Sequence, residues 1–333
     1  MYTSRTIDAM VRHRATMKES YTRHRHGSGF TYKDHSGNTV RDSTLRDYFI
    51  SLAIPPTWTE TEISSDRNAH ILACGYDDAG RKQYIYHPEW HEKQSLARSK
   101  KLTKLIQAMP RLRKHISKDS EKEVGSKEYV LAHAVRLLDV TGIRPGSNRY
   151  YEQHGTHGLT TLRSKHLSVD EEHATLEFVG KSSKEHELII DDEELIEALE
   201  NLDDIPGYEL FQYYNEQGEK KTLTRNEINE YLREISGLDI TAKYLRMWRG
   251  SVACADKILS LSEDGLVTFK ENQHVEIFNH VADTLGNTRT IAEGHYIHDA
   301  LLKVLDQKTH SIPSFTKKPL LSEAESYLLA LVS

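Results

Sequence analysis

The pattern of apolar residues changes near residues 90–97, and this change constrains the fold more than any other feature of the chain. Before it, short runs rich in β-branched and aromatic residues alternate with Ser-Gly, Pro-Pro and Asp-Asp-Ala-Gly turns, which is typical of a small sheet. After it, most apolar residues recur at helical spacing. The sequence therefore predicts an α+β protein with a small β-rich N-terminal domain, residues 1–95, and a larger, mainly α-helical domain, residues 96–333, that contains a small β-hairpin.

Each domain has its own expected elements. In the first, we expect a helix over residues 1–26, strands over residues 30–32, 58–63, 70–76 and 83–86, and a short helix over residues 44–53. In the second, we expect helices over residues 127–140, 192–202, 225–235, 242–261 and 275–285, with Asp191, Thr224 and Thr241 as N-caps. A hairpin over residues 174–190 separates the first two of these helices, and Thr288 begins the segment that carries Tyr296.

Composition predicts a soluble globular protein of the cytoplasm. The 333 residues are 37% hydrophobic and 28% charged, and no apolar run approaches the roughly 18 to 20 residues that a membrane helix needs. The N-terminus has no secretory-signal pattern, and the two cysteines, Cys74 and Cys254, have no metal-type spacing. We therefore expect no membrane association.

Charge is distributed unevenly along the chain, although the net charge is only −6. Residues 1–184 contain 30 Lys and Arg against 22 Asp and Glu, whereas the remainder contains 14 against 28. The sharpest run, residues 98–118, holds eight basic residues and no acidic one, among them Lys100, Lys101 and Lys104. Such a run can neutralise phosphates and release their counterions, although the same pattern also fits a solvated helix face.

Three basic residues stand out by their surroundings. Arg144 follows a helix end and precedes Pro145, which holds it on a stiff turn. Lys181 lies at the tip of the expected hairpin, and Arg246 lies near the edge of the apolar stripe of its helix, able to snorkel toward a cleft. Taken singly, they could equally be a surface arginine, an exposed turn lysine and a structural salt-bridge partner.

Together with Asn287 and Tyr296, these residues form a set suited to phosphoryl transfer. A tyrosine can attack phosphorus and form a covalent ester, which divides one displacement into two. Arginines can hold the nonbridging oxygens and stabilise the transition state, while a lysine can protonate the departing oxygen. The sequence has no Walker-type loop, no carboxylate cluster for magnesium and no Cys/His zinc spacing, so neither a cofactor nor a metal is expected.

The order Arg144, Lys181, Arg246, Asn287, Tyr296 resembles that of the type IB DNA topoisomerases, in the small form found in poxviruses and bacteria. Further matches to the family lie in residues 52–58, 80–87, 141–145, 179–181, 242–248 and 285–288. These matches cover nearly the whole chain, and together they are far more specific than any one alone. The fold implied is that shared by type IB topoisomerases and tyrosine recombinases.

The resemblance implies an enzyme that relaxes positive and negative supercoils without ATP or metal. Tyr296 would attack one strand, form a 3′-phosphotyrosyl link and release a 5′-hydroxyl, and the broken strand would swivel before it is resealed. Arg144, Arg246 and Asn287 would stabilise the transition state, and the leaving-group proton would come from Lys181, with Arg144 as a further donor.

The resemblance also implies that double-stranded DNA is the partner, bound by a monomer that closes as a clamp at the nucleoid. Arg81, Gln83, Tyr84 and Tyr86 match DNA-contacting positions of the N-terminal domain. Strand alternation places Gln83 on one face and the two tyrosines on the other. Lys243 matches a basic position near the scissile phosphate. Because phosphate contacts dominate such binding, we expect weak sequence preference and activity that falls steeply with salt.

Some positions depart from the family pattern, and two other functions fit part of the sequence. Asn287 replaces the histidine of the viral enzymes, although both can donate a hydrogen bond to a nonbridging oxygen. Tyr244, Arg249 and Arg289 also differ from expected residues. A tyrosine recombinase shares the chemistry, but Lys243 stands where its His-x-x-Arg motif has histidine. The other alternative is a non-catalytic DNA-binding protein descended from such an enzyme, but it would not need to keep all five residues of the phosphoryl-transfer set.

Overall fold

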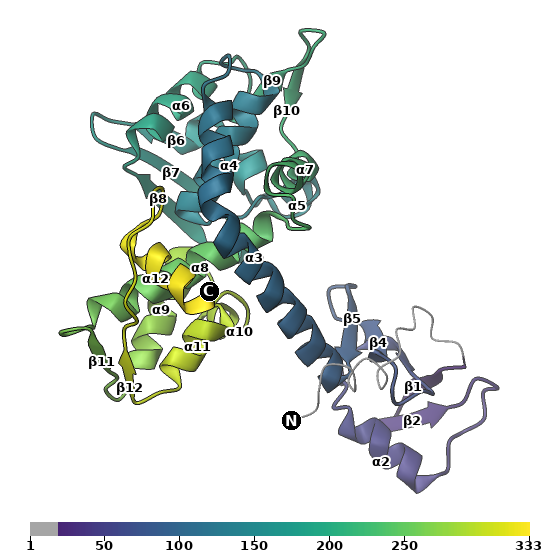
Figure 1. Ribbon diagram of the computed structural model, residues 1–333. Coiled ribbons are helices and arrows are strands. Elements are labelled where there is room, and N and C mark those ends of the chain that lie inside the picture. Colours follow the sequence, from purple (N-terminus) through teal and green to yellow (C-terminus); the bar gives the residue numbers. More distant parts are fainter. Residues whose placement is uncertain (1–18) are drawn as a thin grey trace. The chain divides into compact units, whose positions relative to one another are not determined.

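The structure, a computed structural model, describes residues 19–333, except for the side chain of His91. The chain divides into two compact units, one ending at Arg98 and the other beginning at Ser99 (Figure 1). One long helix, α3 (Pro88–Ser120), runs across this division. The assignment of residues 1–95 to DNA binding and of residues 96–333 to catalysis stays a prediction.

The first unit is built on a five-stranded antiparallel sheet with the strand order β2-β1-β3-β4-β5. The strands are β1 (Tyr21–His26), β2 (Gly29–Lys33), β3 (Thr59–Ile63), β4 (Ile71–Tyr76) and β5 (Lys82–Tyr86). Helix α2 (Ser43–Ser51) packs against the sheet through Phe49, whose ring lies 5.0 Å from that of Tyr21 and 4.9 Å from that of Tyr32. The β-rich character expected from the sequence is therefore confirmed.

The helix expected over residues 1–26 is wrong at its C-terminal end, and residues 1–18 lie outside the described residues. Tyr21–His26 forms strand β1, which pairs with both β2 and β3. The guanidinium of Arg23 is buried and donates hydrogen bonds to the carbonyl oxygens of Ile54, Pro55 and Trp58. Sheet pairing and these long-range bonds outweigh the local helical spacing.

The second unit is mainly helical, as expected (Figure 1). Its helices are the C-terminal part of α3, then α4 (Lys127–Thr141), α5 (Asn148–His154), α6 (Glu193–Asp203), α7 (Arg225–Ser236), α8 (Ala242–Ser260), α9 (Gln273–Leu285), α10 (Arg289–His295), α11 (Asp299–Leu305) and α12 (Glu323–Val332). No helix in residues 19–333 has the length and apolar character needed to cross a membrane.

Three small antiparallel sheets complete the second unit. The largest joins β6 (Leu167–Val169), β7 (Ala174–Val179) and β8 (Glu185–Ile190), and its β7–β8 pair is the expected hairpin. The others pair β9 (Gln212–Tyr214) with β10 (Lys220–Thr222) and β11 (Leu266–Thr268) with β12 (Thr309–Ser311).

Helix ends in the second unit follow the capping signals with two corrections. Thr224 and Glu227 form the expected capping box of α7, and Gly142 ends α4 in the left-handed region with φ 64°. The cap of α6 is Asp192, not Asp191, since the Asp192 carboxylate accepts from the backbone N–H of Leu195. Thr241 precedes α8 but makes no capping hydrogen bond through its side chain.

A buried ion network joins helix α12 to helices α3, α4 and α8. The guanidinium of Arg113 binds Asp139 at 2.7 Å and Glu325 at 2.6 Å, and Asp139 also accepts from the indole N–H of Trp248 at 2.9 Å. Burial alone would lower the pKa of Arg113, but the two carboxylates raise it. Arg113 therefore belongs to the core and is a poor phosphate ligand, unlike the expectation for the basic run.

Replacing Glu325 by Ala is expected to lower the free energy of unfolding by about 3 kcal/mol, because it leaves the half-buried Arg113 with only one carboxylate. Urea denaturation followed by circular dichroism would measure the change. The matched control is Lys221→Ala, which removes an exposed pair with Glu219 and should leave stability within error. Equal stability of the Glu325→Ala variant would show that the network contributes nothing.

A second stability prediction concerns the buried His133, which is 2% exposed and whose ring nitrogens have no hydrogen-bond partner among the described residues. Burial, followed by repulsion from Arg136, lowers its pKa to about 4. Below the unfolded-state pKa of about 6.5, the unfolded chain binds a proton that the folded chain excludes. Stability is therefore complete above pH 6.5 and is lost as pH falls toward 4.

Between pH 7 and pH 5, the wild type is expected to lose about 2 kcal/mol more stability than a His133→Leu variant. Urea titrations of both proteins at the two pH values would test this expectation. Because other groups titrate identically in both proteins, the difference isolates His133. Parallel losses in the two proteins would contradict the prediction.

Candidate active site

Arg144 lies on a loop whose backbone is fixed on both sides. Gly142 turns the chain out of α4, and Pro145 and Gly146 follow the arginine. The backbone N–H of Leu159 donates to the carbonyl oxygen of Arg144 at 2.9 Å, and Thr160 binds that of Pro145 through both its backbone and its hydroxyl. The stiff turn expected from the sequence is therefore held by a second segment of the chain.

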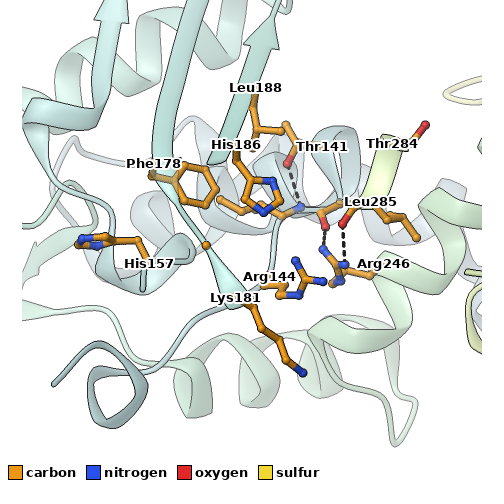
Figure 2. A pocket seen from close by; sticks show the side chains of 13 residues that line it. Thr141, Arg144, His157, Phe178, Lys181, His186, Leu188, Arg246, Thr284 and Leu285 are labelled. Carbon is orange, nitrogen blue, oxygen red and sulfur yellow. Dashed lines mark hydrogen bonds between the residues drawn. The ribbon is translucent and has the colours of Figure 1, made fainter. Parts of the chain in front are cut away.

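Arg246 is buried, with 3% of its surface exposed, rather than snorkelling at the edge of helix α8. Its guanidinium donates to the carbonyl oxygens of Gly142 and Leu285, the latter at 3.0 Å (Figure 2). These carbonyls end helices α4 and α9, so Arg246 joins three helices. It also lines a pocket together with Arg144 and Lys181.

Asn287 connects the two arginines. Its Oδ1 accepts from Nη2 of Arg144 at 2.5 Å and from Nη2 of Arg246 at 3.5 Å. Its Nδ2 is buried and has no hydrogen-bond partner among the described residues. An amide oriented in this way uses its acceptor to hold two cations and leaves its donor for a ligand oxygen.

Tyr296 ends helix α10 and lies directly on helix α8. A Cβ added to Gly250 would come within 2.7 Å of the Tyr296 carbonyl oxygen, so only glycine permits this approach. The next residue of α8, Ser251, has its hydroxyl 3.5 Å from the same oxygen. The Tyr296 ring lies 5.4 Å from Cζ of Arg246, one turn earlier on α8. The structure thus brings the tyrosine to the arginine pair.

The site is strongly electropositive. Burial, followed by repulsion from Arg144, lowers the pKa of Arg246 to about 10, and burial also lowers the pKa of Arg144. Both arginines therefore remain charged at neutral pH. Among residues 19–333, neither arginine forms a salt bridge, and no group of three His, Cys, Asp or Glu is placed to hold a metal ion. An anionic oxygen is the natural ligand of such a pair.

Lys181 lines the same pocket but stands apart from the arginines. It begins the turn between β7 and β8, where Ser182 and Ser183 have positive φ values of 64° and 55°. The side chain is exposed, and its ammonium points away from the guanidinium groups of Arg144 and Arg246 (Figure 2). The structure therefore brings together four of the five expected residues, namely Arg144, Arg246, Asn287 and Tyr296. The fifth, Lys181, lines the pocket at a distance from them.

The expected DNA contacts of the first unit lie on or beside strand β5. Arg81 and Gln83 both donate to the Asp77 carboxylate, at 2.9 and 2.8 Å. Tyr84 is 42% exposed, and its ring lies 5.9 Å from that of Tyr86 on the same face of the strand. The expected separation of Gln83 from the two tyrosines agrees with this arrangement.

Three of the four expected contacts of the second unit are exposed. Lys100 and Lys104 are exposed, one helical turn apart on α3, whereas Lys101 forms a 2.5 Å salt bridge with Asp239. Lys243 is exposed in the first turn of α8, three residues before Arg246.

His186 is among the residues that line the pocket and that sequence analysis did not identify. Its ring stacks on Phe178 and reaches the backbone near Asn287 (Figure 2). Burial, then repulsion from Arg144, lowers its pKa to about 4, so it is neutral at physiological pH. The only sequence signal is its place five residues after Lys181 on the hairpin, which is too common a pattern to identify it.

Two family models of DNA topoisomerases match this chain. The family model of the eukaryotic DNA topoisomerase I catalytic core matches residues 87–319, more than two thirds of the chain. The model of the bacterial DNA topoisomerase IB N-terminal domain matches residues 29–77. The chain belongs to the type IB DNA topoisomerases. The family resemblance and the enzyme class expected from the sequence are thereby confirmed.

Viral enzymes are among the relatives of this topoisomerase. DNA topoisomerase 1B of Acanthamoeba polyphaga mimivirus is 27% identical over 299 residues, which are 86% of this chain and 88% of the viral protein. DNA topoisomerase 1B of vaccinia virus (strain Copenhagen) is 22% identical over 240 residues, 72% of this chain and 73% of the relative.

One solved structure similar to the topoisomerase is the XerH site-specific recombinase bound to palindromic difH substrate. It is 15% identical, with a TM-score of 0.38, over 70% of this chain and 59% of that one. A TM-score of this size is too low to establish a shared fold.

Proposed function

We propose that this type IB topoisomerase relaxes supercoils of both signs by cleaving one strand through Tyr296, without ATP or a metal ion. The observation that carries the proposal is the joint hydrogen bonding of Arg144 and Arg246 to Asn287, with the Tyr296 ring 5.4 Å from Arg246. Two cations, an amide whose donor has no partner among the described residues, and a phenol thus lie close together, and these are the groups that an attack on a phosphodiester uses.

In the proposed reaction, the phenolic oxygen of Tyr296 gives its proton to solvent water and bonds to phosphorus, while the bond from phosphorus to the 5′-oxygen breaks. Arg144, Arg246 and the Asn287 amide stabilise the negative charge on the nonbridging oxygens. The Lys181 ammonium gives its proton to the departing 5′-oxygen. Reversal of these steps reseals the strand, and the ester conserves the bond energy, so ATP is not needed.

Lys181 must approach the scissile phosphate for this step. Its side chain is exposed, so the ammonium has room to turn toward a bound phosphate. Catalytic hydrogen bonds often tighten only when the substrate binds. We therefore assign the proton transfer to the DNA-bound state.

We further propose that a single chain binds the duplex as a clamp, through strand β5 of the first unit and the basic residues of the second. The exposed Lys100, Lys104 and Lys243 and the ring of Tyr84 support this assignment. Arg81 and Gln83 must exchange their bonds to Asp77 for contacts with DNA.

Relaxation assays would test the proposal directly. In buffer with EDTA and without ATP, the protein is expected to convert both negatively and positively supercoiled plasmid to a ladder of relaxed topoisomers. Denaturing gels of end-labelled duplex should show protein attached to the 3′ side of the break. Dependence on magnesium or ATP, relaxation of one sign alone, or strand exchange without relaxation would overturn it.

A further inference from the structure

His186 lies at the centre of the pocket but belongs to none of the catalytic roles above. It stands opposite Phe178 across the β7–β8 pair, and the two rings stack with centroids 5.1 Å apart and an interplanar angle of 12°. Its ring makes no hydrogen bond to any of the described residues. Its contribution to the site is therefore one of shape and contact.

Two glycines approach the His186 ring from different segments. A Cβ added to Gly180 would lie 2.6 Å from Cδ2 of the ring, and one added to Gly286 would lie 2.2 Å from Cε1. Contacts this short do not occur for real Cβ atoms, so the ring fills the space between two bare backbones. Each glycine directly precedes a residue of the proposed mechanism: Lys181 in one case and Asn287 in the other.

The charged groups around the His186 ring favour its neutral form. Arg144, Lys184 and Arg246 are the charged groups that act on His186, and all three are cations. A protonated imidazole would repel them, whereas a neutral aromatic ring separates two segments without adding charge. This property distinguishes His186 from a catalytic acid, because at neutral pH it lacks the acidic second proton of an imidazolium.

We propose that His186 is a positioning residue, a spacer that holds the turn carrying Lys181 at a fixed distance from the turn presenting Asn287. The inference rests on the proposed roles of Lys181 and Asn287. Without the ring, the hairpin tip could move toward or away from α9, and the proton donor and the amide would no longer act on one phosphate. Misplacement by about 1 Å can cost about 100-fold in rate.

The test compares two leaving groups under single-turnover conditions at a mapped cleavage site. One duplex has the ordinary 5′-bridging oxygen, and the other has sulfur there, whose lower basicity removes the need for a proton donor. For His186→Ala, we expect the rate of covalent-adduct formation on the oxygen duplex to fall about 10- to 100-fold. The fold-loss on the sulfur duplex should be smaller than this by a factor of at least about five. His173→Ala, in the β6–β7 connection, is the matched control and should behave as wild type.

Conservative replacement and a double-mutant cycle separate positioning from folding. His186→Gln keeps a flat neutral group and should recover most of the rate lost in His186→Ala. Gly180 has an ordinary backbone conformation, so Gly180→Ala harms chiefly through the new contact with the ring. Gly180→Ala should therefore lower the rate of covalent-adduct formation by a smaller factor in the His186→Ala background than in the wild type.

Each outcome has a definite meaning. Equal loss on both duplexes, wild-type rates for His186→Ala, or additive losses in the cycle would overturn the inference. Lys181→Ala, tested beside it, separates this failure from failure of the proposed mechanism. If the sulfur duplex restores the adduct-formation rate of Lys181→Ala but not that of His186→Ala, only the inference about His186 fails. If it does not restore the rate of Lys181→Ala, the proposed role of Lys181 fails, and the inference fails with it.

Discussion

Replacing Tyr296 by Phe is expected to abolish both plasmid relaxation and covalent-adduct formation, with a loss of at least about 10⁴-fold. The phenolic oxygen is the only atom removed, and it is the proposed nucleophile. The backbone and Cβ of residue 296 remain against Gly250 of helix α8, so folding and duplex binding should not change. Gel assays of relaxation and of protein-linked duplex would measure the loss, with duplex affinity measured in parallel.

Tyr244→Phe is the matched control, since this half-buried tyrosine lies in the first turn of helix α8, the helix against which Tyr296 packs. Its relaxation rate should remain within about threefold of the wild type, because a single peripheral hydroxyl contributes about 1 kcal/mol or less. Adduct formation that persists in Tyr296→Phe would show that another of the 17 tyrosines is the nucleophile.

The second large effect is expected for Arg246→Lys, with a loss of about 10³-fold in the single-turnover cleavage rate. A lysine keeps the charge, but it lacks the planar fork that reaches Gly142, Leu285 and Asn287 together. Duplex affinity should fall by no more than about threefold, since many phosphate contacts share the binding energy. Rapid-quench measurement of adduct formation, together with an equilibrium binding assay, separates the two effects.

Arg233→Lys serves as the control for Arg246→Lys, because Arg233 is an exposed arginine in the last turn of α7. It should cleave at the wild-type rate. Loss of binding equal to the loss of cleavage in Arg246→Lys would mean that the residue holds the substrate generally instead of stabilising the transition state.

The chemistry of the site could be predicted from the sequence because it depends on which residue types occur in which order. Arg144, Arg246, Asn287 and Tyr296 come from four separate segments, and the structure brings them together. Their order alone indicates the family. Their roles stay predictions until the variants are measured.

Spatial relations could not be predicted in the same way. Helical spacing suggested an arginine at the edge of α8, whereas three carbonyl and amide oxygens from distant segments hold Arg246 inside the protein. The spacer position of His186 depends on two glycines about 100 residues apart in sequence, at 180 and 286. Strand β1 was also missed, because pairing with β2 and β3 decided its conformation.

The shared acceptor on Asn287 has a consequence for what the free enzyme recognises. The two guanidinium groups share one acceptor and repel each other, and folding holds them together against this repulsion. A bound phosphodiester would offset this repulsion whichever bases flank it. We therefore expect the arginine pair to contribute no sequence preference, so that any choice among cleavage sites would come from contacts elsewhere on the duplex.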